Sequence, residues 1–314
     1  MLQLRVVCPD DLTDRVAGRL RDDIGVATIG VHRGVSIKPP GDVIECEVVR
    51  ERVNNVVETL RSLGIERRGA LTIVEVDALA SSAVREVERV APGYEADAVP
   101  WSLVEDNASE NAVPAATFFV LMALAAIIAA VGIVIDSAVL IIGAMIVGPE
   151  YGPLTAIAVG LHRRRSFWRS AAIVLLVGLL VAILAAAATA ALALLFGESR
   201  SAFEPQSRFF TGFVTDPNAY SAVVAFVAGI AGTVALARSQ ATALAGVLVS
   251  VTTIPAAAAV GVDIAAADWE DCWHAALQLA INLGALLVAS QLTLAVYDRL
   301  WTAVTRPRRR PRLP

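Results

Sequence analysis

The residues best suited to chemistry lie in one stretch, GAMIVGPEYGP, which runs from Gly143 to Pro153. It stands inside one of the most apolar parts of the chain, yet it contains two prolines, three glycines and one glutamate, Glu150. Each proline removes a backbone donor and clashes with a preceding carbonyl, and the neighbouring glycines add backbone freedom. The positions concerned are Gly148, Pro149, Gly152 and Pro153. We therefore predict a membrane helix that is broken here, with a carboxyl group at the break.

Glu150 is open to two interpretations. A carboxylate in hydrocarbon is costly, so this side chain should be neutral, paired or in contact with a water-filled cavity. It could bind a proton or another cation at a discontinuous helix. It could instead be a protonated structural group that caps broken backbone, or a residue at the membrane interface. In either case the carbonyls released by the break need partners, so the break should face protein or water.

A second interruption is expected in the stretch SVTTIP, which ends at Pro255. It has a single proline, so we expect a kink more than a complete break there. Hydroxyl groups just before the proline could return hydrogen bonds to the loosened backbone. They belong to Ser250, Thr252 and Thr253.

A polar stripe is expected on the last apolar segment. His274, Gln278 and Asn282 are four residues apart, so they share one face of a helix. This face should look into the bundle, where it would either form hydrogen bonds between helices or line a hydrophilic path. A small-residue stripe, Ala182, Ala186, Thr189 and Ala193, predicts a close-packing face on the third apolar segment. The candidate ion or substrate site combines the two interruptions with part of the polar stripe: Gly148, Pro149, Glu150, Gly152, Pro153, Thr252, Thr253, Pro255, Gln278 and Asn282.

Composition separates the chain into two parts. It has 314 residues, 56% of them hydrophobic, and a mean hydropathy of +0.65, which is typical of a membrane protein. Residues 1–111 carry 13 Lys/Arg against 20 Asp/Glu, whereas residues 112–314 carry 13 against 10. The acidic first part argues against nucleic acid as a partner. Three cysteines without a CxxC pair are expected to be buried apolar side chains in a reducing compartment.

Residues 1–77 are predicted to form a cytoplasmic ferredoxin-like domain with the order βαββαβ. Its middle strands are VATIGVHRG and DVIECEVV, separated by a turn in VSIKPPG, and Gly64 should end the second helix. No glycine-rich phosphate loop and no metal-spaced set of ligands is present in the sequence, so no cofactor is expected. The domain could sense a ligand, or it could serve in docking and oligomerisation. Residues 78–112 are expected to be an amphipathic linker.

The rest of the chain is predicted to cross the membrane six times. The domain covers residues 113–298, and a basic cytoplasmic tail follows at 299–314. Arginines concentrate in alternate loops, as in HRRR at 162–165, so the positive-inside rule predicts a multi-pass protein of the cell membrane with both termini in the cytoplasm. The six apolar segments are 113–135, 138–161, 167–196, 219–237, 241–262 and 273–297.

The two halves of the membrane domain are related by a shift of 102 residues, which places Pro153 on Pro255. With three segments in each half, the halves would have opposite topology. Inverted 3+3 repeats with interrupted helices are typical of transporters. We therefore expect an inverted repeat with broken second and fifth helices; six helices with scattered prolines is the alternative.

The membrane domain resembles the domain-of-unknown-function 389 family of bacterial and archaeal membrane proteins. The resemblance covers roughly residues 113–295 and lies in GAMIVGPEYGPLTAIAVGL, the later proline-containing helix at Pro255 and the asparagine at Asn282. Many members have an apolar residue where this chain has Glu150, so the resemblance does not make Glu150 part of a shared mechanism. It implies a fold more than an activity. The motif positions are Gly143, Ala144, Met145, Pro149, Gly152 and Pro153.

These patterns predict a homo-oligomeric transporter or channel for a small solute or ion, with membrane lipids as partners and the soluble domain gating or assembling it. The alternative is a non-transporting membrane sensor or scaffold whose soluble domain binds a ligand or partner. An intramembrane enzyme is not expected, because the spans contain no paired carboxylates and no HExxH, GxSxG or Ser/His set.

Overall fold

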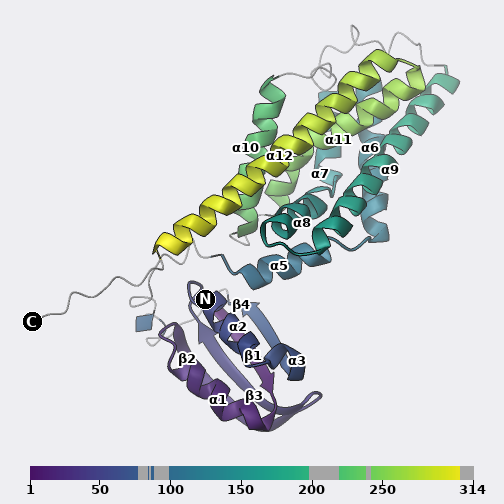
Figure 1. The fold of residues 1–314 in the computed structure, drawn as a ribbon. Helices are drawn as coiled ribbons and strands as arrows, with labels where there is room; N and C mark the ends of the chain where they lie inside the picture. Colours follow the sequence, from purple (N-terminus) through teal and green to yellow (C-terminus); the bar gives the residue numbers. More distant parts are fainter. Residues whose placement is uncertain (77–83, 85, 88–98, 198–218, 238–241, 305–314) are drawn as a thin grey trace, which may run out of the picture. The chain divides into compact units, whose positions relative to one another are not determined.

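The computed structural model describes residues 1–76, 84, 86–87, 99–197, 219–237 and 242–304, without the side chains of 219, 237, 242–252 and 300–304 (Figure 1). The described chain divides into two compact units. Unit 1 contains Met1–Val104 and unit 2 contains Glu105–Tyr297. Most of the predicted linker up to residue 98 and the basic tail from residue 305 onward lie outside the described residues.

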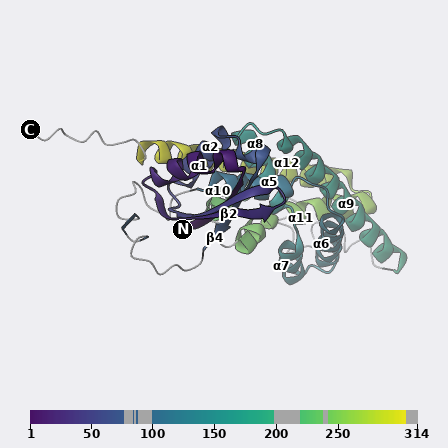
Figure 2. The same cartoon turned by 90° about the horizontal axis from the view of Figure 1, so that it is seen from below.

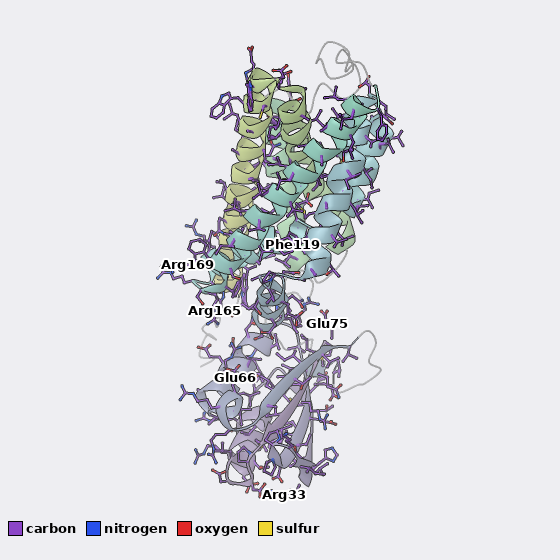
Figure 3. All side chains as sticks on the ribbon, turned by 90° about the vertical axis from the view of Figure 1, so that its right-hand side faces the viewer. Arg33, Glu66, Glu75, Phe119, Arg165 and Arg169 are labelled. Carbon is purple, nitrogen blue, oxygen red and sulfur yellow. The ribbon has the colours of Figure 1, made fainter. Side chains whose placement is uncertain are left out.

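Unit 1 has the predicted βαββαβ order, with one short helix added before the last strand. Its four strands form a single sheet in the order β2-β3-β1-β4, and each neighbouring pair is antiparallel. Charged side chains, among them Arg33 and Glu66, lie on its surface (Figure 3). The elements are β1 (Leu2–Cys8), α1 (Asp10–Arg21), β2 (Val26–Ile37), β3 (Pro40–Val48), α2 (Val53–Ser62), α3 (Ile65–Arg68) and β4 (Ala70–Glu75).

The core of unit 1 follows from the alternation along β1. Leu2, Leu4 and Val6 are fully buried, because every second side chain of a strand points to the same face. Apolar side chains of α1 and α2 cover that face. Cys8 and Cys46 are buried free thiols, and burial raises the pKa of Cys46 to about 12.

The turn between β2 and β3 is tighter than predicted. VSI belongs to β2, which ends at Ile37, and β3 already begins at Pro40. The register between β2 and β3 shifts between His32 and Ser36, and Gly34 lies there with a φ of 64°. A glycine in this left-handed region makes a bulge inexpensive, so the strand continues past it. Gly64, with a φ of 80°, follows the end of α2 as predicted.

Unit 2 is a bundle of apolar helices. Three stretches of the described chain are long and apolar enough to cross a membrane: α6, α9 and residues Trp269–Arg299 of α12; the bent pair α7 and α8 makes a fourth if it counts as one span. Figure 2 shows α6 beside α7 and α9. The helices are α5 (Trp101–Glu110, which begins in unit 1), α6 (Ala116–Val134), α7 (Ala138–Val147), α8 (Tyr151–His162), α9 (Phe167–Leu195), α10 (Ala219–Ala237), α11 (Thr242–Ala266) and α12 (Trp269–Val304).

These lengths indicate a membrane protein. A helix occupies each of the six predicted apolar segments, but the described apolar parts of α10 and α11 are short, at Tyr220–Leu236 and Thr253–Ala266. These lengths establish three or four spans among the described residues, and they establish neither six spans nor an inverted repeat. Large apolar side chains are exposed along α6, α7 and α9, as expected where helices face lipid.

The central helix of unit 2 is α11, which packs against α6, α7, α8, α9 and α10. Every residue from Thr253 to Asp263 is buried. This segment, TIPAAAAVGVD, is small on all sides, so neighbouring helices approach it closely. At Gly261 an added Cβ would lie 2.4 Å from the carbonyl oxygen of Ile183 in α9. Ala182 and Ala186 of the predicted small-residue stripe are buried on that helix.

Candidate functional site

The predicted break is present in unit 2. Helix α7 ends at Val147 and α8 begins at Tyr151, and the two helices are bent by 53°. Gly148 is extended, with φ −63° and ψ 123°, which takes the chain out of the helix. Helical hydrogen bonding resumes at once, because the Leu154 N–H donates to the Glu150 carbonyl at 3.2 Å. The break is therefore short and well formed.

The carboxyl group of Glu150 lies inside the bundle. The side chain is fully buried, and Oε1 accepts a hydrogen bond from Oγ1 of Thr253 at 2.5 Å. The two residues are 103 positions apart and lie at the start of α8 and in α11. The fold thus brings the carboxyl group of the first interruption to a hydroxyl group of the second.

Gly148 makes room for this arrangement. A Cβ at this position would lie 2.5 Å from Oε2 of Glu150 and 2.7 Å from Cγ1 of Ile254. Gly152 is similarly crowded, since its Cβ would lie 2.9 Å from Oδ1 of Asn111. Gly148 is therefore favoured by close contacts as well as by the bend, whereas at Gly152 the Asn111 side chain could move aside for a larger residue.

The second predicted break is wrong: α11 is one helix from Thr242 to Ala266, with Pro255 inside it. A single proline removes one donor and leaves the helix able to continue, whereas the first interruption combines two prolines with two glycines. Ser250 and Thr252 were also expected to form hydrogen bonds with the backbone near Pro255, but their side chains lie outside the described part of the chain. Pro255 itself lies next to the buried Ile254.

Gln278 and Asn282 belong to a second polar cluster. Both are buried, and Ser221 of α10 contacts each of them. Ser221 Oγ lies 3.3 Å from Oδ1 of Asn282, and Gln278 Nε2 lies 3.4 Å from the same oxygen. The polar face of α12 thus looks into the bundle as predicted, and it joins α12 to α10. The predicted site residues therefore fall into two groups held by different helices.

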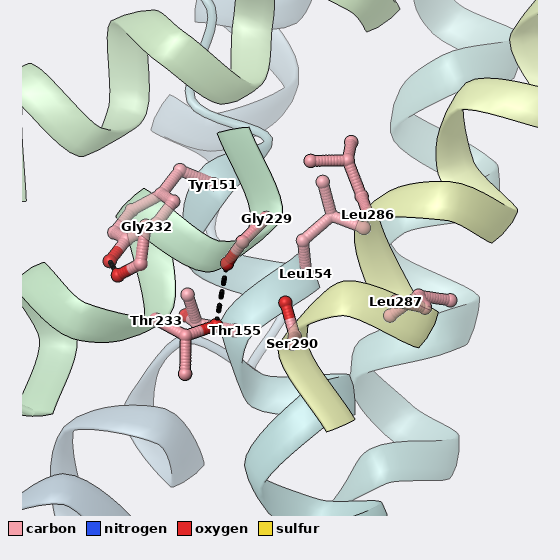
Figure 4. A pocket seen from close by; sticks show the side chains of 9 residues that line it. All are labelled: Tyr151, Leu154, Thr155, Gly229, Gly232, Thr233, Leu286, Leu287 and Ser290. Carbon is pink, nitrogen blue, oxygen red and sulfur yellow. Dashed lines mark hydrogen bonds between the residues drawn. The ribbon is translucent and has the colours of Figure 1, made fainter. Parts of the chain in front are cut away.

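A small cavity lies between α8, α10 and α12 (Figure 4). Its volume of about 20 Å³ is enough for one water molecule. The Tyr151 hydroxyl donates to the Gly232 carbonyl at 2.8 Å, and the Thr233 hydroxyl donates to the Gly229 carbonyl at 2.8 Å. One of its lining residues, Tyr151, directly follows Glu150 in the chain. Its lining residues are Tyr151, Leu154, Thr155, Gly229, Gly232, Thr233, Leu286, Leu287 and Ser290.

Unit 2 contains two further buried carboxyl groups, and no sequence pattern described above predicts either of them. Asp263 is 1% exposed in α11. The run of small residues before it, on all faces of the helix, was a usable signal of burial. Glu105 is 8% exposed in α5 and binds two arginines of the turn between α8 and α9. Nothing in the sequence pairs these residues, which are about 60 positions apart.

The Glu105 cluster allows a direct test of its strength. Replacing Glu105 with glutamine should lower the free energy of unfolding by about 1–2 kcal/mol, because it leaves Arg163 and Arg165 without their carboxylate. The effect is moderated because the two arginine side chains are 36% and 48% exposed. Thermal denaturation of detergent-solubilised protein measures it. Glu110→Gln, at an exposed position of the same helix, is the matched control; equal midpoints for the two variants would contradict the expectation.

Among the described residues, no group of three or more His, Cys, Asp or Glu side chains is placed to hold a metal ion. Glu150 is the acidic group of its cluster, with a neutral hydroxyl as its partner. The arrangement is suited to holding one proton or one small cation.

Comparison with known proteins adds one finding. A family model described as "Domain of unknown function (DUF389)" matches residues 145–288, a range that begins inside α7 and ends inside α12. No curated protein and no solved structure matches the chain.

Proposed function

We propose that this chain, whose residues 145–288 belong to the DUF389 family, passes a small cation across the membrane, with the proton as the first candidate. The observation that carries the proposal is Glu150, a fully buried carboxyl group at a broken helix that shares a hydrogen bond with α11. Ionisable groups inside a membrane are costly and mark ion pathways or proton relays. A cavity of about 20 Å³ nearby supports an ion over a larger solute, since pockets for organic ligands are usually above about 300 Å³.

The proposed architecture has six spans, arranged as two inverted halves, in a homo-oligomer with both termini in the cytoplasm; the second span is broken and the fifth is one continuous helix. The contact between Glu150 and Thr253 supports it, because a shift of 102 residues places these two positions within one residue of each other. In many transporters a discontinuous helix at the interface of two inverted repeats forms part of the binding site. Unit 1 would gate or assemble the membrane part.

Proton entry into liposomes tests the proposal. The full-length protein is reconstituted with an internal pH dye, and a potassium diffusion potential drives protons inward at several pH values. Glu150→Gln should lower the rate by about 100-fold, the lower range for loss of a positioned proton-transfer group. Thr253→Val, which removes the hydroxyl partner, should also lower it.

Glu110→Gln serves as the control and should leave the rate unchanged, because this side chain is exposed on α5. Equal rates for the wild type and Glu150→Gln would overturn a proton pathway through Glu150. If neither protein admits protons, the carboxyl group is structural, and the sensor or scaffold function becomes the one to test on unit 1.

A further inference from the structure

The turn between α8 and α9 contains two arginines that form ion pairs and a third that is exposed between them. Arg163 and Arg165 are tied to Glu105: Nε of Arg163 lies 2.7 Å from Oε1, and Nη2 of Arg165 lies 2.6 Å from Oε2. Arg164 stands between them, exposed, with its backbone in the left-handed region at a φ of 54°. Its carboxylate-bound neighbours therefore fix the turn, and Arg164 projects from a defined backbone.

A fourth arginine follows at the start of α9. Arg169 is exposed, and its guanidinium carbon lies 5.6 Å from the centre of the Trp168 ring. A cation over an aromatic face is held in place without losing its charge. Arg165 and Arg169 lie at the same end of the helical bundle (Figure 3). Glu105 carries one negative charge, whereas the four arginines carry four positive charges.

An apolar strip begins where the arginines end. Ile173, Leu176 and Leu180 follow Arg169 by four, seven and eleven residues, and their exposed fractions are 62%, 64% and 55%. This spacing places them on the same face of α9 as Arg169. Aromatic and basic residues at the end of an exposed apolar helix face mark the boundary between hydrocarbon and headgroups.

We propose that this surface binds an anionic phospholipid. Arg164 and Arg169 would hold the phosphate and the negatively charged headgroup, and the acyl chains would lie along the strip of Ile173, Leu176 and Leu180. The arginine geometry suits phosphate oxygens, which accept charge-assisted hydrogen bonds from guanidinium groups. The proposal is independent of cation passage, because it concerns the rim of the bundle and not Glu150.

Fluorescence quenching of Trp168 by brominated lipids tests it. Trp269, Trp273 and Trp301 are replaced with phenylalanine, which leaves Trp168 as the reporter, together with Trp101, which is 9% exposed in unit 1. The protein is reconstituted in phosphatidylcholine vesicles with brominated phosphatidylglycerol or brominated phosphatidylcholine. We expect the anionic lipid to associate at least about fivefold more tightly, as one arginine near the headgroups contributes. Salt should weaken the preference.

The double variant Arg164→Gln/Arg169→Gln should remove the preference, whereas Arg164→Lys/Arg169→Lys, which keeps the charge, should retain most of it. Arg19→Gln/Arg21→Gln, at exposed positions of α1, changes the net charge equally and should have no effect. Equal quenching by the two lipids would refute an anionic-lipid site. A preference that survives in the glutamine variant would place the attraction elsewhere on the protein and would refute this surface.

Discussion

Replacing Gly261 with leucine should prevent α11 from packing and abolish the folded membrane unit. An added Cβ would lie 2.4 Å from the Ile183 carbonyl oxygen and 2.7 Å from Cβ of Ala186, both on α9. Backbone cannot move aside as a flexible side chain can, and α11 contacts five other helices. Overpacking alone costs typically about 1–3 kcal/mol, and here the whole helix has to separate from its neighbour, so we expect a larger loss.

Size-exclusion profiles and thermal denaturation of the solubilised protein measure this effect. Gly284→Leu is the matched control, because Gly284 lies in the apolar helix α12 and an added Cβ there meets nothing within 4 Å. The control should remain monodisperse, with a midpoint close to that of the wild type. A folded Gly261→Leu protein with an unchanged midpoint would show that α9 and α11 are not held together in this way.

Replacing Gly148 with valine should uncouple Glu150 from Thr253 while leaving most of the bundle folded. The new side chain would start 2.5 Å from the carboxyl oxygen and 2.7 Å from Ile254, so the carboxyl group has to leave its present position. A buried carboxyl group that loses its hydrogen bond costs about 1–3 kcal/mol. If Glu150 carries protons, their entry into liposomes should fall to the level of Glu150→Gln.

The control for Gly148 is a glycine of the same motif. Gly143 lies in α7, and a Cβ added there meets nothing within 4 Å, so Gly143→Val should leave both the midpoint and the proton entry rate close to wild type. The denaturation midpoint and the proton entry rate test different roles of the carboxyl group. Lost stability with full proton entry would mean that the position of the carboxyl group is structural only, and unchanged values for both would contradict the close contact itself.

Much of the architecture could be predicted because its causes are local. Alternation in LQLRVVC defines one buried face of β1, and Gly64 ends α2 because a left-handed residue is needed there. The cluster of two prolines and two glycines breaks the helix between Val147 and Tyr151 whatever surrounds it. The spacing of Gln278 and Asn282 likewise defines a helix face, and that face is buried.

The failures also have a local cause. The repeat places Pro255 on Pro153 and so predicts a broken fifth helix, but a helix tolerates the loss of one hydrogen bond when its neighbours hold it in place. VSIKPPG was assigned to a turn because of its prolines, yet the bulge near Gly34 allows β2 to continue to Ile37. In both cases the strength of a breaking signal was overestimated.

The sequence by itself determined where this chain bends, which faces of its helices are apolar, and that a carboxyl group stands at the bend. Only the tertiary structure decided what that carboxyl group contacts. Thr253 reaches Glu150, and Glu105 reaches Arg163 and Arg165, across separations of 103 and about 60 residues. Periodicity fixes the side of a helix on which a residue lies. The residue that it contacts on another helix depends on which helices pack together and on how far they are shifted along their axes. Close contacts such as that of Gly261 with α9 set this arrangement.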